Sequence, residues 1–426
     1  MRHCDCLPLR RFFVACILLS CFPLTSRADD PVPTEPTRRW WKGNMHTHSL
    51  WSDGDDFPEM IAEWYRTENY NFLVLSDHNV LGLGQRWMKQ TAIAKRGGQA
   101  ALAKYKARFG GSWVETRGEG DDLEIRLKPL DEFRYLVEDR GQFILIPGEE
   151  VSDRAAGKPI HMNVSNVAEV IKPMGGATPV EAMSNNLRAV EEQAKRLGRE
   201  MLMHLNHPNF GWAITAEEMA QVTSEQFFEV YNGHPGVNQL GDATRPSIEH
   251  MWDIANAMRL TVLEATPLLG LATDDSHDYH DGMLSRSITG RGWVMVRSEY
   301  LTPEHLIQAL RRGDFYASSG VSLEEVTFDS ESRTLTVKID PEAGETYTTQ
   351  FIGTRIAPDA DKTAMPATEQ IGIEFAKQEG NVATYTMQPG ELYVRATVTS
   401  SKGADRPSFK DQKKQAWTQP VGYETR

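Results

Sequence analysis

The sequence predicts an α/β protein in which a parallel sheet with helices is followed by a smaller antiparallel β-domain. Short apolar runs alternate with helical segments over the first three quarters of the chain, as in βα units. After residue 320, apolar and polar residues alternate between Gly, Pro and Asp breaks instead. The 426 residues also suffice for one α/β barrel of about 250 residues and an appended domain.

The first residues of the chain have the pattern of an export signal. Arginines precede an apolar run over residues 12–22, and small residues follow at 26–28. The run is too short to span a bilayer. We therefore expect residues 1–28 to be a signal peptide, 29–41 a linker, and the protein to be periplasmic or extracellular. A lipoprotein cleavage box ending at Cys21 and a twin-arginine pattern are alternatives for the export route.

The composition excludes some partners. The chain has 46 Lys and Arg against 59 Asp and Glu, a net charge of -13, so bulk charge does not favour nucleic acid. No later stretch is apolar enough for a transmembrane helix. All four cysteines lie within the first 21 residues, so the predicted mature chain has no thiol. The composition leaves the oligomeric state open.

The α/β part is expected to contain seven strands and at least four helices. The strands are expected at 44–48, 72–76, 143–147, 201–205, 227–231, 268–273 and 293–296. The helices are expected at 57–69, 179–197, 246–258 and 302–312. Residues 82–140 are charged and mostly helical in pattern, so we interpret them as an insertion over one face. With this insertion, the α/β part is expected to cover residues 42–320.

The last hundred residues predict an antiparallel β-sandwich over 321–426. Alternating runs at 323–328, 334–339, 348–352 and 392–399 predict its strands. No internal repeat or heptad array is present. We interpret this part as an accessory domain packed on the α/β part.

Histidines and carboxylates gather at or just after the ends of the expected strands. His46 and His48 are two residues apart and so share one face of a strand. The other groups are Asp53, Asp77, His78, Glu149, Glu150, His161, His204, His207, Asp274, Asp275 and His277. Catalytic groups of α/β barrels meet at the carboxyl ends of the strands. Histidine and carboxylate ligands without cysteine suit Zn, Mn or Fe.

Each of these motifs has an ordinary structural interpretation by itself. A His-x-His pair is often a surface feature, and Asp77-His78 is compatible with a capped turn. Their accumulation at five strand ends would leave many polar groups unpaired unless an ion binds them. The joint pattern therefore predicts a multinuclear metal site.

The same motifs resemble, in order, those of the PHP (polymerase and histidinol phosphatase) superfamily over about residues 42–320. They are His46-Thr47-His48, Ser52-Asp53-Gly54, Ser76-Asp77-His78, Pro147-Gly148-Glu149-Glu150, His161, Asn206-His207-Pro208 and Asp275-Ser276-His277. The segments at 229–233, 272–275 and 316–320 resemble an exported, carbaryl-hydrolase-like branch. The resemblance implies a distorted (β/α)7 TIM-like barrel, a trinuclear site and hydrolysis of phosphate esters.

The resemblance also implies a ligand set for three divalent ions. It assigns His46, His48, Glu150 and Asp275 to the first ion, Asp53, His78 and His277 to the second, and Glu150, His161 and His207 to the third. Glu150 and Asp275 are chosen over Glu149 and Asp274 because the family motifs read Gly-x-Glu and Asp-x-His. His204 is expected to be a supporting or structural residue.

A mechanism follows from closely spaced ions. A bridging hydroxide attacks phosphorus or a carbonyl carbon, and the ions neutralise the developing charge. Asp275 is the candidate catalytic residue that accepts the proton of the water. Asn232 is expected to orient substrate or to cap a turn, and His280 is a candidate substrate contact. Basic residues in the loops are candidates for a phosphate clamp, namely Arg86, Lys89, Arg245 and Arg286.

Three functions compete. The leading one is a secreted metal-dependent phosphoesterase acting on a small-molecule or phosphorylated substrate, and the second is a carboxylester or carbamate hydrolase. The third is a non-catalytic module whose β-domain binds sugar, lipid or protein through aromatic residues such as Tyr347 and Trp417. The complete ligand set favours an enzyme.

Overall fold

The computed structural model describes residues 37–356 and 363–424 together with Met1. The predicted signal segment and the four cysteines lie outside these residues. From Arg38 onward the chain forms one compact unit. Among the described residues, every helix is too short or too polar to span a bilayer.

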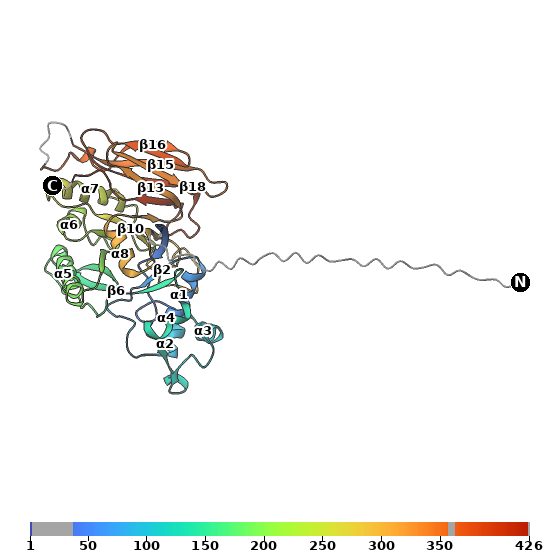
Figure 1. Ribbon diagram of the computed structural model, residues 1–426. Helices are drawn as coiled ribbons and strands as arrows, with labels where there is room; N and C mark the ends of the chain where they lie inside the picture. The colour runs from blue at the N-terminus through green and yellow to red at the C-terminus, as the bar shows by residue number, and fades with distance from the viewer. Residues whose placement is uncertain (2–36, 357–362, 425–426) are drawn as a thin grey trace. The chain divides into compact units, whose positions relative to one another are not determined.

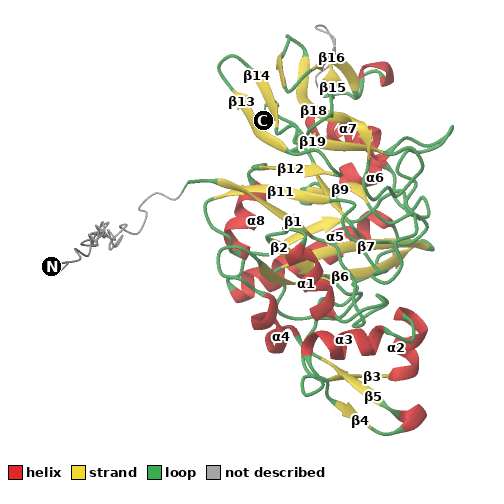
Figure 2. Cartoon of the chain, turned by 90° about the vertical axis from the view of Figure 1, so that its right-hand side faces the viewer, coloured by secondary structure: helices red, strands yellow, loops and turns green. Residues whose placement is uncertain are grey.

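The α/β part is built on nine strands of a 13-stranded mixed sheet (Figures 1 and 2). They are β1 (Arg39–Asn44), β2 (Phe72–Leu75), β6 (Ile144–Ala155), β7 (Lys158–Ser165), β8 (Leu202–Leu205), β9 (Phe227–Asn232), β10 (Leu269–Thr273), β11 (Trp293–Ser298) and β12 (Phe315–Ser318). Their order is β10-β9-β8-β7-β6-β2-β1-β11-β12. The pairs β1–β2, β2–β6, β8–β9 and β9–β10 are parallel, and the other pairs are antiparallel.

A closed barrel is not confirmed, because no ladder in the described part of the chain joins β10 to β1. The segments that follow these two strands do meet. Thr47 and Ser276 form an isolated parallel bridge, and the His48 amide donates to the Ser276 carbonyl at 3.0 Å. This contact brings the loops after β1 and β10, which carry most of the candidate ligands, to one place.

Two strands differ from the expectation. β1 begins at Arg39, so the residues expected to end the linker pair with β11 instead, and the expected 44–48 strand lies mostly beyond its end. β6 continues to Ala155 and pairs with β7, which the pattern did not predict. Both pairings are antiparallel, so the sheet is less parallel than βα alternation suggests.

The helices of the α/β part follow the sequence signals closely. They are α1 (Pro58–Thr67), α5 (Pro179–Leu197), α6 (Ala216–Gln221), α7 (Ile248–Thr261) and α8 (Pro303–Arg311). For α5, the Thr178 side chain accepts from the Glu181 amide and Gly198 ends the helix in the left-handed conformation. Its buried residues Ala182, Met183, Leu187 and Val190 follow a helical period and pack into the largest core cluster.

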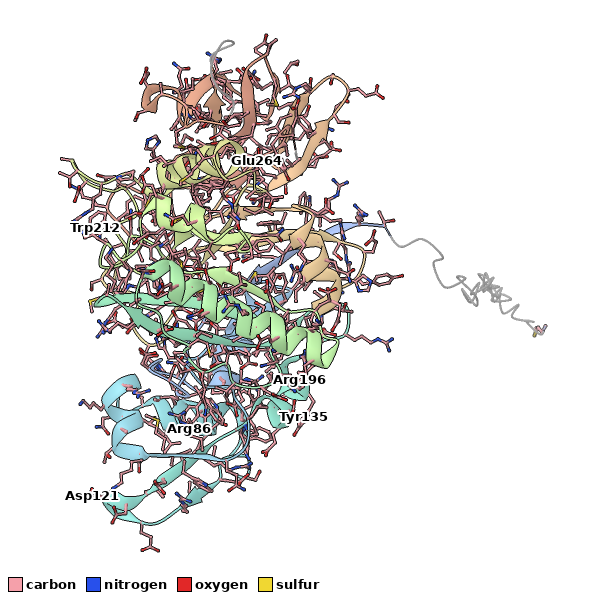
Figure 3. The ribbon with its side chains drawn as sticks, turned by 90° about the vertical axis from the view of Figure 1, so that its left-hand side faces the viewer. Arg86, Asp121, Tyr135, Arg196, Trp212 and Glu264 are labelled. Atoms are coloured by element: carbon pink, nitrogen blue, oxygen red, sulfur yellow. The ribbon has the colours of Figure 1, made fainter. Side chains whose placement is uncertain are left out.

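The insertion contains α2 (Gln90–Gly97), α3 (Ala101–Phe109), α4 (Leu130–Val137) and a small antiparallel sheet. The sheet consists of β3 (Arg86–Lys89), β4 (Thr116–Arg117) and β5 (Glu124–Leu127). Its strands are short and charged, so their alternation is hard to see in the sequence. α3 packs on α1, where the Tyr105 hydroxyl donates to the buried Glu59 at 2.5 Å. Figure 3 labels Arg86 and Asp121 in this insertion.

The strands after residue 320 form two antiparallel groups. β13 (Leu323–Asp329), β14 (Thr334–Ile339) and β17 (Val382–Thr386) make a separate sheet, whereas β15 (Tyr347–Arg355), β16 (Ile373–Glu379), β18 (Glu391–Gly403) and β19 (Lys413–Thr418) extend the large one. Apolar residues of both groups share one core. β19 pairs with β12, with Trp417 opposite Ala317, so the large sheet continues across residue 320.

Candidate metal centre

The loop after β1 is held between the segments that follow β2 and β10. The Ser76 amide donates to the Thr47 carbonyl at 2.9 Å, and the Asn44 side chain accepts from the Asp274 amide at 3.0 Å. Asn44 is fully buried. These bonds bring the His46-Thr47-His48 motif next to the motifs around His78 and Asp275.

The nine predicted ligands lie together around Glu150. One oxygen of this carboxylate lies 3.6 Å from His46 Nε2, 3.3 Å from His48 Nε2 and 2.7 Å from His78 Nδ1. The other lies 2.9 Å from His161 Nδ1 and 3.8 Å from His207 Nε2. Glu150 is therefore placed to be shared by more than one cation.

Asp275 faces the same space from the loop after β10. Its Oδ1 lies 3.2 Å from His46 Nε2 and 3.3 Å from His48 Nε2, and its Oδ2 lies 3.8 Å from His207 Nε2. The backbone of Asp275 has a φ of 50°, a conformation that costs free energy in a residue other than glycine. Its hydrogen bond to Asn232 helps to fix this orientation.

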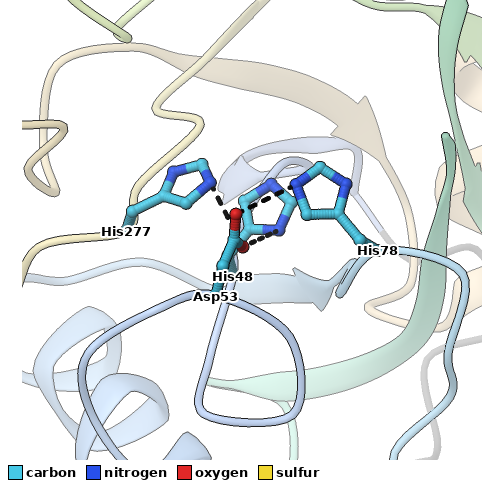
Figure 4. Close-up of side chains that lie close together, drawn as sticks. All are labelled: His48, Asp53, His78 and His277. Carbon is cyan, nitrogen blue, oxygen red and sulfur yellow. Dashed lines mark ion pairs between the residues drawn. The ribbon is translucent and has the colours of Figure 1, made fainter. Parts of the chain in front are cut away.

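Asp53 joins His48, His78 and His277 in a second group, which Figure 4 shows. Asp53 lies 3.5 Å from His78 Nε2, 3.5 Å from His277 Nε2 and 3.8 Å from His48 Nδ1. The Asp53 side chain is 54% exposed, whereas that of Glu150 is 1% exposed. The centre therefore opens to solvent on the side of Asp53.

The two acidic doublets divide between the centre and its support. Glu149 turns away from Glu150 and accepts from the Ile171 amide at 2.8 Å. Asp274 accepts from the Tyr65 hydroxyl at 2.7 Å and from the amides of residues 290–292. Only the later member of each doublet faces the histidines.

Buried atoms without hydrogen-bond partners show that the centre fits divalent ions. His46 Nε2, His48 Nε2 and Glu150 Oε2 are buried, face one another and have no hydrogen-bond partner among the described residues. The Glu150 carboxylate lies close to His78 Nδ1, but not in the direction of a hydrogen bond. The His78 ring instead makes a hydrogen bond with Ser152 Oγ at 2.5 Å. Such atoms cost free energy unless a cation binds them.

The histidine orientation agrees with this interpretation. His46 Nδ1 lies 2.7 Å from the buried carboxylate of Glu229, so Nδ1 carries a proton, and Nε2 faces Glu150 and Asp275. These carboxylates require positive charge at Nε2, either a proton or a metal ion. A carboxylate behind the histidine is the common support of a metal-bound imidazole.

The pKa shifts of the histidines also fit a centre that binds cations. Burial and the neighbouring His277 lower the pKa of His48 to about 3, which keeps its imidazole neutral. Burial disfavours the charged form of His78, but Glu150 and Asp53 outweigh burial and raise the pKa to about 11. The carboxylates thus attract positive charge, which protons on the histidines supply and metal ions would replace.

Sequence reasoning assigned no role to Glu229 or to Asn206. Besides His46, Glu229 accepts from the His207 amide at 2.8 Å and from Asn232 at 2.7 Å. Asn206 donates to Glu150 at 2.8 Å. The available signal for Glu229 was a carboxylate inside the otherwise apolar run of β9. His204 lies behind the centre, 3.5 Å from Glu229, as a supporting residue.

The three predicted substrate contacts each face other side chains of the protein. Asn232 is buried, and its amide group donates to Glu229 and Asp275, so it positions Asp275. His280 contacts Asp56 and Lys104 in a neighbouring cavity. Arg286 lies 3.4 Å from Asp278 and 3.8 Å from Asp281, so its charge is already compensated.

The other clamp candidates are engaged too. Lys89 pairs with Asp122 at 3.0 Å, Arg245 pairs with Asp242 and stacks on Trp212, and Arg86 lies over Trp51. Figure 3 shows Arg86 in the insertion and Trp212 at the edge of the α/β part. The aromatic residues proposed for a binding module, Tyr347 and Trp417, are buried in the core.

Comparisons with known proteins add a distant structural likeness. Neither a protein-family model nor a curated protein sequence matches the chain. Among solved structures, a two-domain protein containing a predicted PHP-like metal-dependent phosphoesterase from Bacteroides vulgatus ATCC 8482 is 15% identical, with a TM-score of 0.41. The match covers 90% of this chain and 96% of that chain. At this level of similarity, the function is inferred from the site itself.

Proposed function

We propose that the chain is a metal-dependent hydrolase with a trinuclear centre, of the PHP type that its motifs resemble. The observation that carries the proposal is the set of buried atoms without hydrogen-bond partners, His46 Nε2, His48 Nε2 and Glu150 Oε2. Water or a neutral molecule does not compensate the carboxylates around them, whereas divalent cations do.

The proposed ligands form three overlapping groups. The first ion would be held by His46, His48, Glu150 and Asp275, the second by Asp53, His78 and His277, and the third by Glu150, His161 and His207. Among the described residues, five groups of His, Asp and Glu have ligand atoms within 4.8 Å of one another, and four of these groups consist only of the nine proposed ligands, although divided differently. The fifth contains His204 and Glu229 behind the centre. Zn, Mn and Fe suit such ligands.

Bound ions supply an activated water and neutralise the negative charge that develops during hydrolysis. Asp275 provides the proton acceptor at Oδ2, which Asn232 holds toward the centre at 3.1 Å. Burial would raise the pKa of Asp275, but His46 and other histidines hold it well below its usual range, so the group is ionised. The exposed side of the centre, at Asp53, admits the substrate.

Phosphate monoesters or diesters are the leading substrates, because a centre of three cations attracts an anion that the acidic protein otherwise repels. Carboxylic esters or carbamates are the second candidate class. The engagement of Arg86, Lys89, Arg245 and Arg286 with other residues favours this alternative, since none of them is free to clamp a phosphate.

Metal analysis and a substrate panel test the proposal. We expect purified protein to contain about three Zn, Mn or Fe ions per chain, and His48→Ala to contain fewer. The panel consists of p-nitrophenyl phosphate, bis-p-nitrophenyl phosphate and p-nitrophenyl acetate. Turnover of acetate alone would select the second substrate class, and a wild-type protein without metal would refute both.

We also propose that the chain is exported. The proposal depends on the basic, apolar and small-residue pattern of residues 1–28. Mass spectrometry of the mature protein tests it: an N-terminus near residue 29, or an acylated Cys21, is expected. An intact Met1 in protein from the producing cell would contradict it.

A further inference from the structure

A cavity of about 330 Å³ lies beside the metal centre. Its walls come from α1 and the loop before it, from α3 of the insertion, from the loop after His277, and from the segment between β18 and β19. Asp56 and Asp278 line it, and they follow the candidate ligands Asp53 and His277 closely in sequence. The cavity and the centre are therefore formed by the same two loops.

Two cations line this cavity without a carboxylate partner. Lys104 Nζ lies 3.5 Å from His280 Nδ1, and the Arg406 guanidinium donates to the Thr289 carbonyl at 3.4 Å and stacks over Trp64 at 5.0 Å. Neither Lys104 nor Arg406 forms an ion pair within the described part of the chain. They come from segments about 300 residues apart, so the fold rather than local sequence brings them together.

His280 holds Lys104 at the cavity. Its Nδ1 faces the Lys104 ammonium at 3.5 Å and accepts, so the proton lies on Nε2. Nε2 is buried and faces protein acceptors, the Asp55 carbonyl and an Asp56 carboxylate oxygen 3.6 Å away. The two cations that line the cavity therefore supply the attraction for an anion.

The acidic residues of the cavity are compensated. Asp278 and Asp281 both face the Arg286 guanidinium, at 3.4 and 3.8 Å. Asp56 accepts from the Phe57 amide at 2.8 Å, and burial raises its pKa to about 7. The charges of Lys104 and Arg406 are thus the ones without a counterpart.

We propose that this cavity binds an oxyanion, a phosphate, sulfate or carboxylate group, through Lys104 and Arg406. Two sources share this chemistry: a second anionic group of the substrate whose scissile bond lies at the metal centre, or a free anion that acts as an effector. The first source rests on the proposed function, whereas binding of an anion by the cavity is independent of that function.

Calorimetric titration of inorganic sulfate into the full chain tests the site. We expect saturable binding to the wild type and to His48→Ala alike, and at least tenfold weaker binding to Lys104→Met/Arg406→Met. The matched control is Lys106→Met/Lys410→Met, which removes the same charge from exposed positions of α3 and of the segment before β19 and should bind as the wild type does. Lys104→Met alone serves if the double variant does not fold.

The outcomes separate the two proposals. Sulfate binding lost in His48→Ala would place the anion at the metals, and equal binding by Lys104→Met/Arg406→Met and the wild type would also overturn the cavity site. Sulfate binding that stays intact in a protein without hydrolytic activity would refute the proposed function only. In an active enzyme, sulfate that raises KM through Lys104 and Arg406 identifies a substrate group, and sulfate that changes kcat alone identifies an effector.

Discussion

The candidate metal centre and the contact between α7 and β18 both bury carboxylates beside cationic side chains, but only the second contact satisfies them. Arg395 donates to both oxygens of Asp253, at 2.9 and 2.7 Å, and the Tyr393 hydroxyl donates to the same carboxylate at 2.7 Å. Both charged side chains are almost fully buried.

At the metal centre, by contrast, imidazole and carboxylate atoms face one another without hydrogen bonds. The difference teaches how to distinguish a structural charge cluster from a binding site. Burial and charge occur in both regions, so they do not discriminate. Between these two regions the unsatisfied buried atoms make the difference, because at the centre they lie on side chains that face one another and require a partner.

The largest expected effect comes from Glu150→Gln. Loss of the shared carboxylate removes charge from two of the three proposed groups of ligands, so metal content falls and hydrolysis falls by about 1000-fold or more. Glu149→Gln is the matched control, since Glu149 is the preceding residue and is also buried, but faces away from the histidines. Metal analysis and kcat/KM measure the effect, and equal losses in the two variants would contradict the assignment.

Asp253→Ala tests the satisfied contact. It leaves the buried Arg395 guanidinium with only its longer carboxylate contact, to Glu249 at 3.4 Å, which costs about 3 kcal/mol in the free energy of unfolding. Urea unfolding measures this loss, and metal content should not change. Replacing both residues, as Asp253→Leu/Arg395→Met, should recover most of the stability. Loss of metal in Asp253→Ala would contradict the distinction, because it would show that metal binding depends on the contact between α7 and β18.

Glu229→Gln is expected to weaken metal binding without unfolding the protein. Glu229 does not face the ions but holds His46 Nδ1, so we expect metal affinity to fall about 10- to 100-fold while the fold persists. Metal competition with a chelator measures the affinity, and circular dichroism checks the fold. Unchanged affinity would show that His46 is positioned without Glu229.

The smallest effect, about 1 kcal/mol per pH unit, concerns a buried carboxyl outside both regions. Burial raises the pKa of Glu225 to about 8 from an ordinary value of 4.5, so the folded state keeps its proton where the unfolded state loses it. This stabilisation is complete below about pH 4.5 and is lost as the pH rises to about 8. Relative to Glu225→Gln, the wild type should lose about 1 kcal/mol per pH unit in this window.

Urea unfolding of the wild type and Glu225→Gln at several pH values measures the difference. A constant difference between pH 5 and 8 would mean that Glu225 is already ionised in the folded protein. Glu225 would then be a third kind of buried charge, different from those at the metal centre and at the Asp253–Arg395 contact, because water reaches it when the fold opens transiently.

The residues of the metal centre were more predictable from sequence than the sheet that carries them. His46, His48 and the doublets 149–150 and 274–275 were found because residue type, spacing and position at strand ends depend on local sequence. The choice of Glu150 and Asp275 within the doublets came from the resemblance to the PHP motifs. Glu229 was not found, because its role depends on the contact with His46, a residue distant in sequence.

The fold was predictable in the same uneven way. α5 has the bounds that its cap and apolar period predict. The pairing of β1 with β11 and the hairpin of β6 and β7 were not predicted, because the choice between parallel and antiparallel partners is made by long-range packing. The cavity with Lys104 and Arg406 depends on such packing entirely.

The continuity between β12 and β19 has a consequence for any attempt to divide the protein. Tyr316, Ala317 and Ser318 of β12 pair with residues 416–418, and the Gln419 side chain bonds to the Gly270 backbone. A fragment that stops at residue 320 would expose β12 as an open sheet edge, a template for aggregation. The half with the candidate metal centre thus depends on the final strand to protect its edge.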